Sequence, residues 1–266
     1  MYINIIILFI IGLLLSFFFS KWGYRLPIGE DIFEPSKCDK CNHKLKFIEK
    51  IPVLSYIIQR GKCNYCNQKI SWTYLLYELM TGTLFSLTYI SFIGEDSPKV
   101  KILFGLVFLS GLIIIIYSDI KYMIISDEIL IVFTSLVVIF KLYISFRNEE
   151  IITLLDLGYE FIFMLIDAAI MYFIMFAIKK LGDLIFKKES LGYGDLKMMI
   201  YIAIVMGYKE SIIIIFLASV FALIPSIINN YKKDKVMLPF GPFLAFATIL
   251  LFLMKLDFNS LLELLH

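Results

Sequence analysis

Two aspartates at the ends of long apolar runs have the residue type and the setting that peptide hydrolysis requires. Asp119 closes the run ILFGLVFLSGLIIIIYSD, and Asp195 lies in the segment Leu-Gly-Tyr-Gly-Asp-Leu-Lys, which opens another run. Acidic residues at such places are costly to bury and are therefore functional candidates. When two carboxyl groups share one proton, the ionised group can activate a water molecule while the neutral group hydrogen-bonds a scissile carbonyl. We therefore predict Asp119 and Asp195 as a catalytic pair.

The residues around Asp195 are predicted to aim its side chain. Gly192 and Gly194 allow a tight backbone turn before the span, and Lys197 completes the predicted active-site turn. The alternative is that each aspartate only caps a helix, which is ordinary chemistry for a carboxylate at a helix N-terminus.

Four further acidic residues lie in or beside the apolar runs: Glu78, Asp127, Glu128 and Asp167. Asp127 is expected to start a helix, and Glu78 to face the inner mouth of the bundle. Asp167 lies in the middle of a run and is expected to be buried and hydrogen-bonded, or to act as a third polar group in the bundle.

The four cysteines form two C-x2-C pairs with 21 residues between them: Cys38, Cys41, Cys63 and Cys66. Each pair offers two thiolates on a tight turn, and two pairs complete a tetrahedron, so the spacing resembles a zinc ribbon and predicts one zinc ion. Such a metal can serve purely as a staple, which a polar loop of this size needs. His43 could compete as a ligand, but we expect it to be solvated.

The elements that must position these residues are membrane helices. Sixty per cent of the 266 residues are apolar and only 18% are charged, which leaves too little polar surface for a soluble globule. The net charge is only +2, whereas nucleic-acid-binding proteins carry a concentrated basic face, so no nucleic-acid partner is expected. Lipid is the expected solvent, and about eight helices are predicted over residues 2–20, 73–93, 99–118, 128–145, 160–178, 195–207, 210–229 and 239–256.

Basic residues predict the orientation of these spans. With the N-terminus outside, the inner segments together with Lys197 hold 19 of the 25 Lys and Arg residues. The cysteines then lie in the reducing cytoplasm, where structural disulfides are rare. Lys141 lies within a span and is expected to snorkel to its outer end. The run 195–207 is short for a span. The alternative is one long tilted helix over 195–229, but that helix would place three lysines outside. We therefore predict two spans there, separated by a turn at Gly207.

An ordered set of motifs resembles the type IV prepilin peptidases, which belong to the GxGD class of intramembrane aspartic proteases. The set comprises Tyr24-Arg25-Leu26-Pro27, Ile51-Pro52-Val53-Leu54-Ser55-Tyr56 between the cysteine pairs, Arg60-Gly61-Lys62-Cys63, Glu78-Leu79, Ser118-Asp119-Ile120, Gly192-Tyr193-Gly194-Asp195-Leu196-Lys197 and Pro239-Phe240-Gly241-Pro242-Phe243. Two segments depart from the family pattern: Ser16-Phe17-Phe18-Phe19-Ser20 replaces Gly-Ser-Phe-Leu-Asn, and Ile125-Ser126-Asp127 replaces Ile-Pro-Asp. Neither departure touches the predicted pair.

The resemblance implies a substrate and a second activity. Family members cut the basic leader of a prepilin or pseudopilin at the cytoplasmic face and then methylate the new N-terminus with S-adenosylmethionine. It also implies three regions: a first membrane helix over 1–20, a cytoplasmic zinc-binding loop over 21–72 with the methyltransferase function, and a peptidase bundle over 73–266.

Two other classes of function remain open from the sequence. A transporter or channel could use the intramembrane carboxylates as a proton or cation relay, and an inverted repeat would favour it. A non-catalytic assembly factor could retain the same fold, but the presence of both aspartates argues against it.

Overall fold

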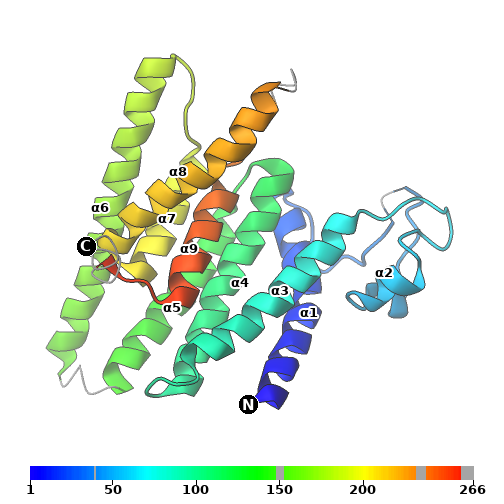
Figure 1. The fold of residues 1–266 in the computed structure, drawn as a ribbon, viewed down its shortest axis with the longest axis horizontal. Helices are drawn as coiled ribbons and strands as arrows, with labels where there is room; N and C mark the ends of the chain where they lie inside the picture. The colour runs from blue at the N-terminus through cyan, green and yellow to red at the C-terminus, as the bar shows by residue number, and fades with distance from the viewer. Residues whose placement is uncertain (39, 148–152, 232–237, 259–266) are drawn as a thin grey trace. The chain divides into compact units, whose positions relative to one another are not determined.

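The computed structural model describes residues 1–38, 40–147, 153–231 and 238–258, and Figure 1 shows its helices. Regular structure in these residues consists of α-helices and short 3-10 segments, with two isolated antiparallel bridges and no longer strand. The all-helical prediction is therefore confirmed. The chain divides into two compact units, Met1–Ile93 and Gly94–His266.

The first unit pairs two long helices, α1 (Tyr2–Arg25) and α3 (Trp72–Phe92), with the cysteine-bearing loop between them in sequence. Two glycines allow the helices to pack closely, because a Cβ on Gly12 would lie 2.9 Å from the Cα of Gly82. Asn4 also donates a hydrogen bond of 3.0 Å to the Tyr89 hydroxyl. The loop contributes two short 3-10 segments, η1 (Leu26–Ile28) and η2 (Ile48–Lys50), and the short helix α2 (Leu54–Ile58).

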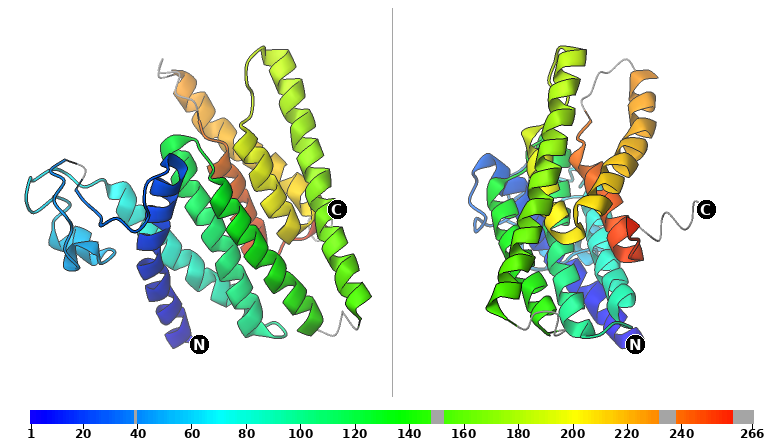
Figure 2. Two further views of the ribbon diagram at one scale, coloured as in Figure 1. Left: turned by 180° about the vertical axis from the view of Figure 1, so that it is seen from behind. Right: turned by 90° about the vertical axis from the view of Figure 1, so that its left-hand side faces the viewer.

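In the described part of the second unit, the helices form a bundle: α4 (Pro98–Tyr122), α5 (Asp127–Arg147), α6 (Leu154–Phe186), α7 (Tyr193–Met206), α8 (Tyr208–Tyr231) and α9 (Gly241–Met254). Its interior is formed mainly by α4, α7 and α9, which carry long runs of buried apolar side chains. Figures 1 and 2 show α7 alongside α6 and α9, and the packing of α7 against both helices agrees with this. Within this interior, the buried Tyr201 hydroxyl of α7 donates a hydrogen bond of 2.8 Å to the Phe108 carbonyl of α4.

Within the described ranges, five helical segments are long and apolar enough to cross a membrane: Tyr2–Ile28, Pro98–Tyr122, Asp127–Arg147, Leu155–Phe186 and Tyr208–Ile228. The outer helices expose large apolar side chains, among them Ile131 on α5, Phe173 on α6 and Phe216 on α8, each at least 66% exposed. Such exposure suits a lipid solvent and would be costly in water. The structure places a helix over each of the eight predicted runs, and five of these meet the criterion for a span.

The helix break predicted near residue 207 is present, and Lys141 contacts the end of the helix that precedes it. Gly207 ends α7 with a φ of +83°, a conformation that favours glycine, and α8 begins at the next residue. Lys141 donates from Nζ to the Ile204 carbonyl at 2.8 Å. Its ammonium group therefore reaches the last carbonyls of the short helix α7, which need a donor that the helix itself lacks.

Candidate active site and metal centre

The two predicted catalytic aspartates are brought together from different helices of the second unit. Asp119 lies in the last turns of α4 and Asp195 in the first turn of α7, with 5% and 8% of their surfaces exposed. A Cβ placed on Gly241 would lie 2.5 Å from Asp119 Oδ2 and 3.6 Å from Asp195 Oδ1. The two oxygens are therefore at most 6.1 Å apart, the sum of these distances. One water molecule that hydrogen-bonds both oxygens at ~2.8 Å spans up to ~5.6 Å, which is close to this upper bound.

Gly241, the first residue of α9, is a third member of this site that the sequence reasoning did not assign. Its backbone approaches the Asp119 carboxyl so closely that no side chain fits between them. Among the described residues, Asp119 Oδ2 has no hydrogen-bond partner although it is buried. A buried carboxylate oxygen without a partner is costly and marks a place where chemistry is expected. The motif Pro239-Phe240-Gly241-Pro242-Phe243 was the available signal.

Neither Gly192 nor Gly194 has a positive φ, which corrects the predicted reason for these two glycines, and only Gly194 leaves space for a close approach. Gly192 precedes α7 with φ −72° and ψ 149°, values that any residue adopts. Gly194 lies in the first turn of α7, where a Cβ would approach the Ile125 side chain to 3.1 Å. This close approach lets the turn pack against the segment between α4 and α5, and so next to Asp119.

The helix-capping alternative for Asp195 retains support. Asp195 is the third residue of α7, and its Oδ2 would lie 3.4 Å from a Cβ on Gly192, the residue that caps the helix. A carboxylate at this position interacts favourably with the helix N-terminus. Capping does not explain why Asp195 also approaches Asp119, so the two roles can coexist.

Lys197 connects the predicted turn to the start of α5. Its Nζ donates to both carboxylate oxygens of Asp127, at 2.6 and 2.8 Å. Asp127 begins α5 as expected, but it also forms this bidentate ion pair. Both side chains are about half exposed, so the pair orients the two helix ends and contributes little to the free energy of unfolding.

The remaining acidic candidates each have contacts of their own. Glu78 accepts a hydrogen bond of 2.7 Å from the Val53 backbone N–H in the loop. Val53 has φ +62° and ψ −54°, a strained conformation for a β-branched residue, so Glu78 stabilises a costly turn. Asp167 lies near Gly207 at the α7–α8 break, and Glu128 accepts from the Ser126 hydroxyl at 3.3 Å.

The four cysteine sulfurs converge in the loop of the first unit. Their Sγ atoms all lie within 4.8 Å of one another, with Cys38 to Cys66 at 3.8 Å and Cys41 to Cys63 at 4.0 Å. A tetrahedron with Zn–S bonds of ~2.3 Å has edges of ~3.8 Å, so this donor set fits a zinc ion, whereas disulfide bonds are ~2.05 Å long. Backbone N–H groups of Cys41 and Lys40 lower the pKa of the Cys38 thiol to about 7. Despite a hydrogen bond from the His43 backbone, burial and the neighbouring thiols raise the pKa of the Cys41 thiol to about 11, so Cys38 is the thiol that ionises first.

The two cysteine turns are copies of each other in sequence and geometry. Both read Lys-Cys-x-x-Cys-Asn-x-Lys, and Asn42 and Asn67 both have φ +54°. Each first cysteine also donates from its N–H at 2.9 Å, Cys38 to the His43 carbonyl and Cys63 to the Gln68 carbonyl. This short repeat is a signal that the spacing argument did not use. His43, expected to be solvated, instead stacks on the Tyr65 ring with centroids 3.5 Å apart.

Comparisons with known proteins also divide the chain into an N-terminal and a C-terminal part. Residues 10–92 match the Bacterial Peptidase A24 N-terminal domain, and residues 106–227 match the Type IV leader peptidase family. Asp119 and Asp195 lie in the second match and the four cysteines in the first.

Relatives named prepilin leader peptidase/N-methyltransferase include a protein of Bacillus subtilis (strain 168), 31% identical over 93% of each chain. A Dichelobacter nodosus protein of the same name is 32% identical over 82% of this chain and 70% of its own. A third, from Aeromonas hydrophila, is 26% identical over 85% of this chain and 76% of its own. No solved structure matches the chain.

Proposed function

Since the chain belongs to the family of prepilin leader peptidase/N-methyltransferases, we propose that Asp119 and Asp195 are the pair with which it cleaves the leader of a prepilin or pseudopilin. The observation that carries this proposal is the approach of both carboxyl groups to Gly241, from α4 and α7, in a buried part of the bundle. The comparisons give the transporter alternative no support.

The proposed mechanism uses one ionised and one neutral carboxyl group. Two carboxylates this close cannot both ionise easily, so they share a proton. The ionised group removes a proton from a water molecule, whose oxygen attacks the scissile carbonyl carbon. The neutral group donates its proton to the carbonyl oxygen, and the resulting tetrahedral intermediate collapses when the leaving nitrogen takes up a proton. Gly241 leaves room for both carboxyl groups to face one water molecule.

The five apolar helices found among the described residues and the family membership indicate a multi-pass protein of the inner membrane. We propose the finer topology of eight spans with the N-terminus outside. The concentration of 19 of 25 basic residues in the inner segments and at Lys197 supports this topology. Under it, the catalytic pair and the cysteine loop both face the cytoplasm, where the basic leader of a prepilin would remain.

The loop over residues 21–72 is proposed to hold one zinc ion through Cys38, Cys41, Cys63 and Cys66, and to carry the methyltransferase function. Zinc would supply a structural staple that joins the two cysteine turns. A cavity of about 460 Å³ lies beside the second turn, and its lining includes Arg60, Lys62 and Lys69. Three cations do not fit S-adenosylmethionine, whose sulfonium is itself positive, and we derive no methyl-transfer step through this cavity.

The test is incubation of the purified protein with a prepilin in detergent, followed by intact-mass analysis. The wild-type protein should remove a leader-sized mass and then add the mass of a methyl group. Asp119→Asn and Asp195→Asn should each abolish cleavage, and the double variant should be scarcely worse, because the two groups act as a unit. Asp96→Asn is the matched control, since Asp96 is an exposed aspartate outside the helices. Appreciable cleavage by either single variant would refute the assignment.

A further inference from the structure

Lys179 of α6 is the most deeply buried cation among the described residues, and the proposed chemistry does not use it. Only 2% of its surface is exposed, and its helix segment is one of the five apolar enough to cross a membrane. A buried lysine in such a setting is expensive and needs a specific partner. Its position within an apolar helix therefore calls for an explanation in terms of what its ammonium group binds.

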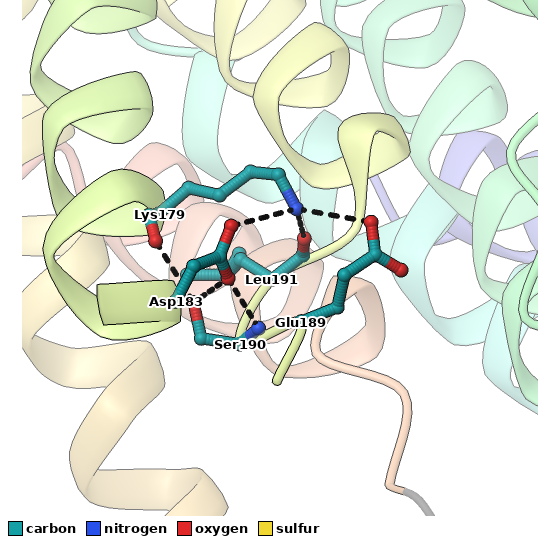
Figure 3. Close-up of polar contacts among 5 residues, drawn as sticks. All are labelled: Lys179, Asp183, Glu189, Ser190 and Leu191. Atoms are coloured by element: carbon teal, nitrogen blue, oxygen red, sulfur yellow. Dashed lines mark hydrogen bonds and ion pairs between the residues drawn. The ribbon is translucent and has the colours of Figure 1, made fainter. Parts of the chain in front are cut away.

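Figure 3 shows that the ammonium group binds the loop that leads into α7. Lys179 Nζ donates to the Leu191 carbonyl at 2.5 Å and forms ion pairs with Asp183 at 3.6 Å and Glu189 at 3.5 Å. Nζ also lies 4.6 Å from the centre of the Tyr193 ring, a cation–π distance. Three of these four partners belong to the segment immediately before Asp195 or to the GxGD turn itself.

A second set of contacts fixes the same loop against α6. The Ser190 N–H donates to Asp183 Oδ1 at 2.7 Å, and its hydroxyl group contacts the same oxygen at 2.9 Å. Gly182 leaves the space for this contact, because a Cβ there would lie 2.5 Å from Ser190 Oγ. The loop is therefore held at two points, by the Asp183 carboxyl group at Ser190 and by the buried ammonium group at Leu191.

The contact at Leu191 is the one that bears on the catalytic turn. Leu191 directly precedes Gly192, whose peptide begins the turn that carries Asp195 into α7. Gly192 lacks a side chain that could anchor the backbone, so the anchor must come from a neighbour. Lys179 supplies it from both sides of this glycine, through the carbonyl of residue 191 and the ring of residue 193.

We propose that Lys179 is a positioning residue of the peptidase: its buried ammonium group fixes the start of α7 and thereby holds the Asp195 carboxyl beside that of Asp119. The proposal rests on the proposed function of the pair. It assigns Lys179 no contact with substrate. It explains why an expensive buried cation is retained in an apolar helix where a methionine would occupy a similar volume.

Stability and catalysis should separate in Lys179→Met. The partner carboxylates of Lys179 remain solvated when the cation is removed, because the Asp183 side chain is 28% exposed and that of Glu189 is 82% exposed. Replacing a buried charge by an apolar side chain of similar size is then close to neutral for stability. Misplacement of a catalytic group by ~1 Å, in contrast, can lower the rate ~100-fold.

The experiment compares Lys179→Met, Lys179→Arg and the control Lys180→Met, measuring kcat and KM for prepilin cleavage, the melting temperature, and amide hydrogen exchange of the 187–195 segment. Lys180 is the adjacent lysine of α6, and it is exposed. We expect Lys179→Met to lower kcat ~10- to 100-fold with KM and melting temperature close to those of Lys180→Met, and to accelerate exchange in the loop. Lys179→Arg should restore part of kcat, because its guanidinium can still donate to the Leu191 carbonyl.

Two results would overturn the proposal. Lys179→Met could match Lys180→Met in kcat, or it could lose kcat only in proportion to a loss of folded protein, which would make Lys179 a stability residue. Failure of the proposed function itself has a different signature, since Asp119→Asn and Asp195→Asn would then still cleave prepilin. The two ideas can therefore fail separately.

Discussion

Replacing Gly241 by alanine should damage catalysis while leaving the fold intact. The added Cβ would lie 2.5 Å from Asp119 Oδ2, whereas contacts shorter than 3.0 Å are essentially never formed by a Cβ atom. The carboxyl group must therefore shift by at least 0.5 Å, the difference between these distances. Alanine is a better helix former than glycine by up to ~1 kcal/mol in a helix interior, so the first turn of α9 should not lose stability.

The size of the effect follows from how far the carboxyl group must move. A displacement of ~1 Å in a catalytic group costs ~100-fold in rate, and Asp119 has a short side chain that can yield only by rotating away from Asp195. We therefore expect Gly241→Ala to lower kcat for cleavage by ~10- to 100-fold. Methylation of a pilin that has already been cleaved should be unchanged, because Gly241 lies outside the cysteine loop.

A graded series of glycine substitutions makes this assay specific. Gly192→Ala would place its Cβ at an ordinary contact distance of 3.4 Å from Asp195 Oδ2, and a Cβ on Gly94 would meet nothing within 4 Å. Cleavage rates should therefore fall in the order Gly94→Ala, Gly192→Ala, Gly241→Ala, at equal melting temperatures. Full activity in Gly241→Ala would show that the Asp119 carboxyl does not face Gly241 during catalysis.

Three further outcomes are expected. Replacing Cys63 and Cys66 by serine should remove stoichiometric zinc, measured by elemental analysis, and leave cleaved pilin unmethylated, whereas equal loss of both activities would place the loop in the protease site. Glu78→Ala should remove the acceptor for the Val53 N–H and destabilise residues 51–58 by ~1–3 kcal/mol. Hydrogen exchange of these residues should be faster in Glu78→Ala than in Glu78→Gln, which keeps an acceptor oxygen. The hydrogen bond from Lys101, together with Lys255, lowers the pKa of Glu95, so the stability that Glu95 contributes is present above its unfolded-state pKa and is lost as pH falls through the folded-state pKa. Glu95→Gln should abolish this part of the acid dependence of the melting temperature, at a cost of about 1 kcal/mol or less, since all three side chains are partly exposed; an unchanged acid dependence would contradict it.

The helices could be predicted from the sequence because apolar run length decides them locally. Helix α6 shows where this argument reaches its limit. The apolar run ended at residue 178, but the helix continues to Phe186. The added turns include Lys179 and Asp183, which pair with each other and with the loop, so tertiary contacts sustain helix beyond the apolar run.

The charged members of the candidate site could be predicted from the sequence, but Gly241 and the physical role of Gly194 could not. Asp119 and Asp195 were distinguishable because a carboxylate beside an apolar run is unusual. Gly241 carries no such signal, since its importance comes from what is near it, and Asp119 is 122 positions away in the chain. Gly194 is similar: the sequence indicated a special backbone shape, whereas the structure gives it a close packing contact with Ile125.

Lys179 and Lys180 are equivalent in the sequence argument on membrane orientation but differ in the structure. The charge rule counts Lys179 and Lys180 equally, because membrane orientation depends on the number of cations near a span end. The structure separates them completely, since Lys179 is buried against the α6–α7 loop while Lys180 is exposed. A count of charges does not depend on which group each charge contacts. The free energy of burying a charge does depend on that contact. Substituting either lysine should therefore alter the inner positive charge by the same amount, and only Lys179 should alter catalysis.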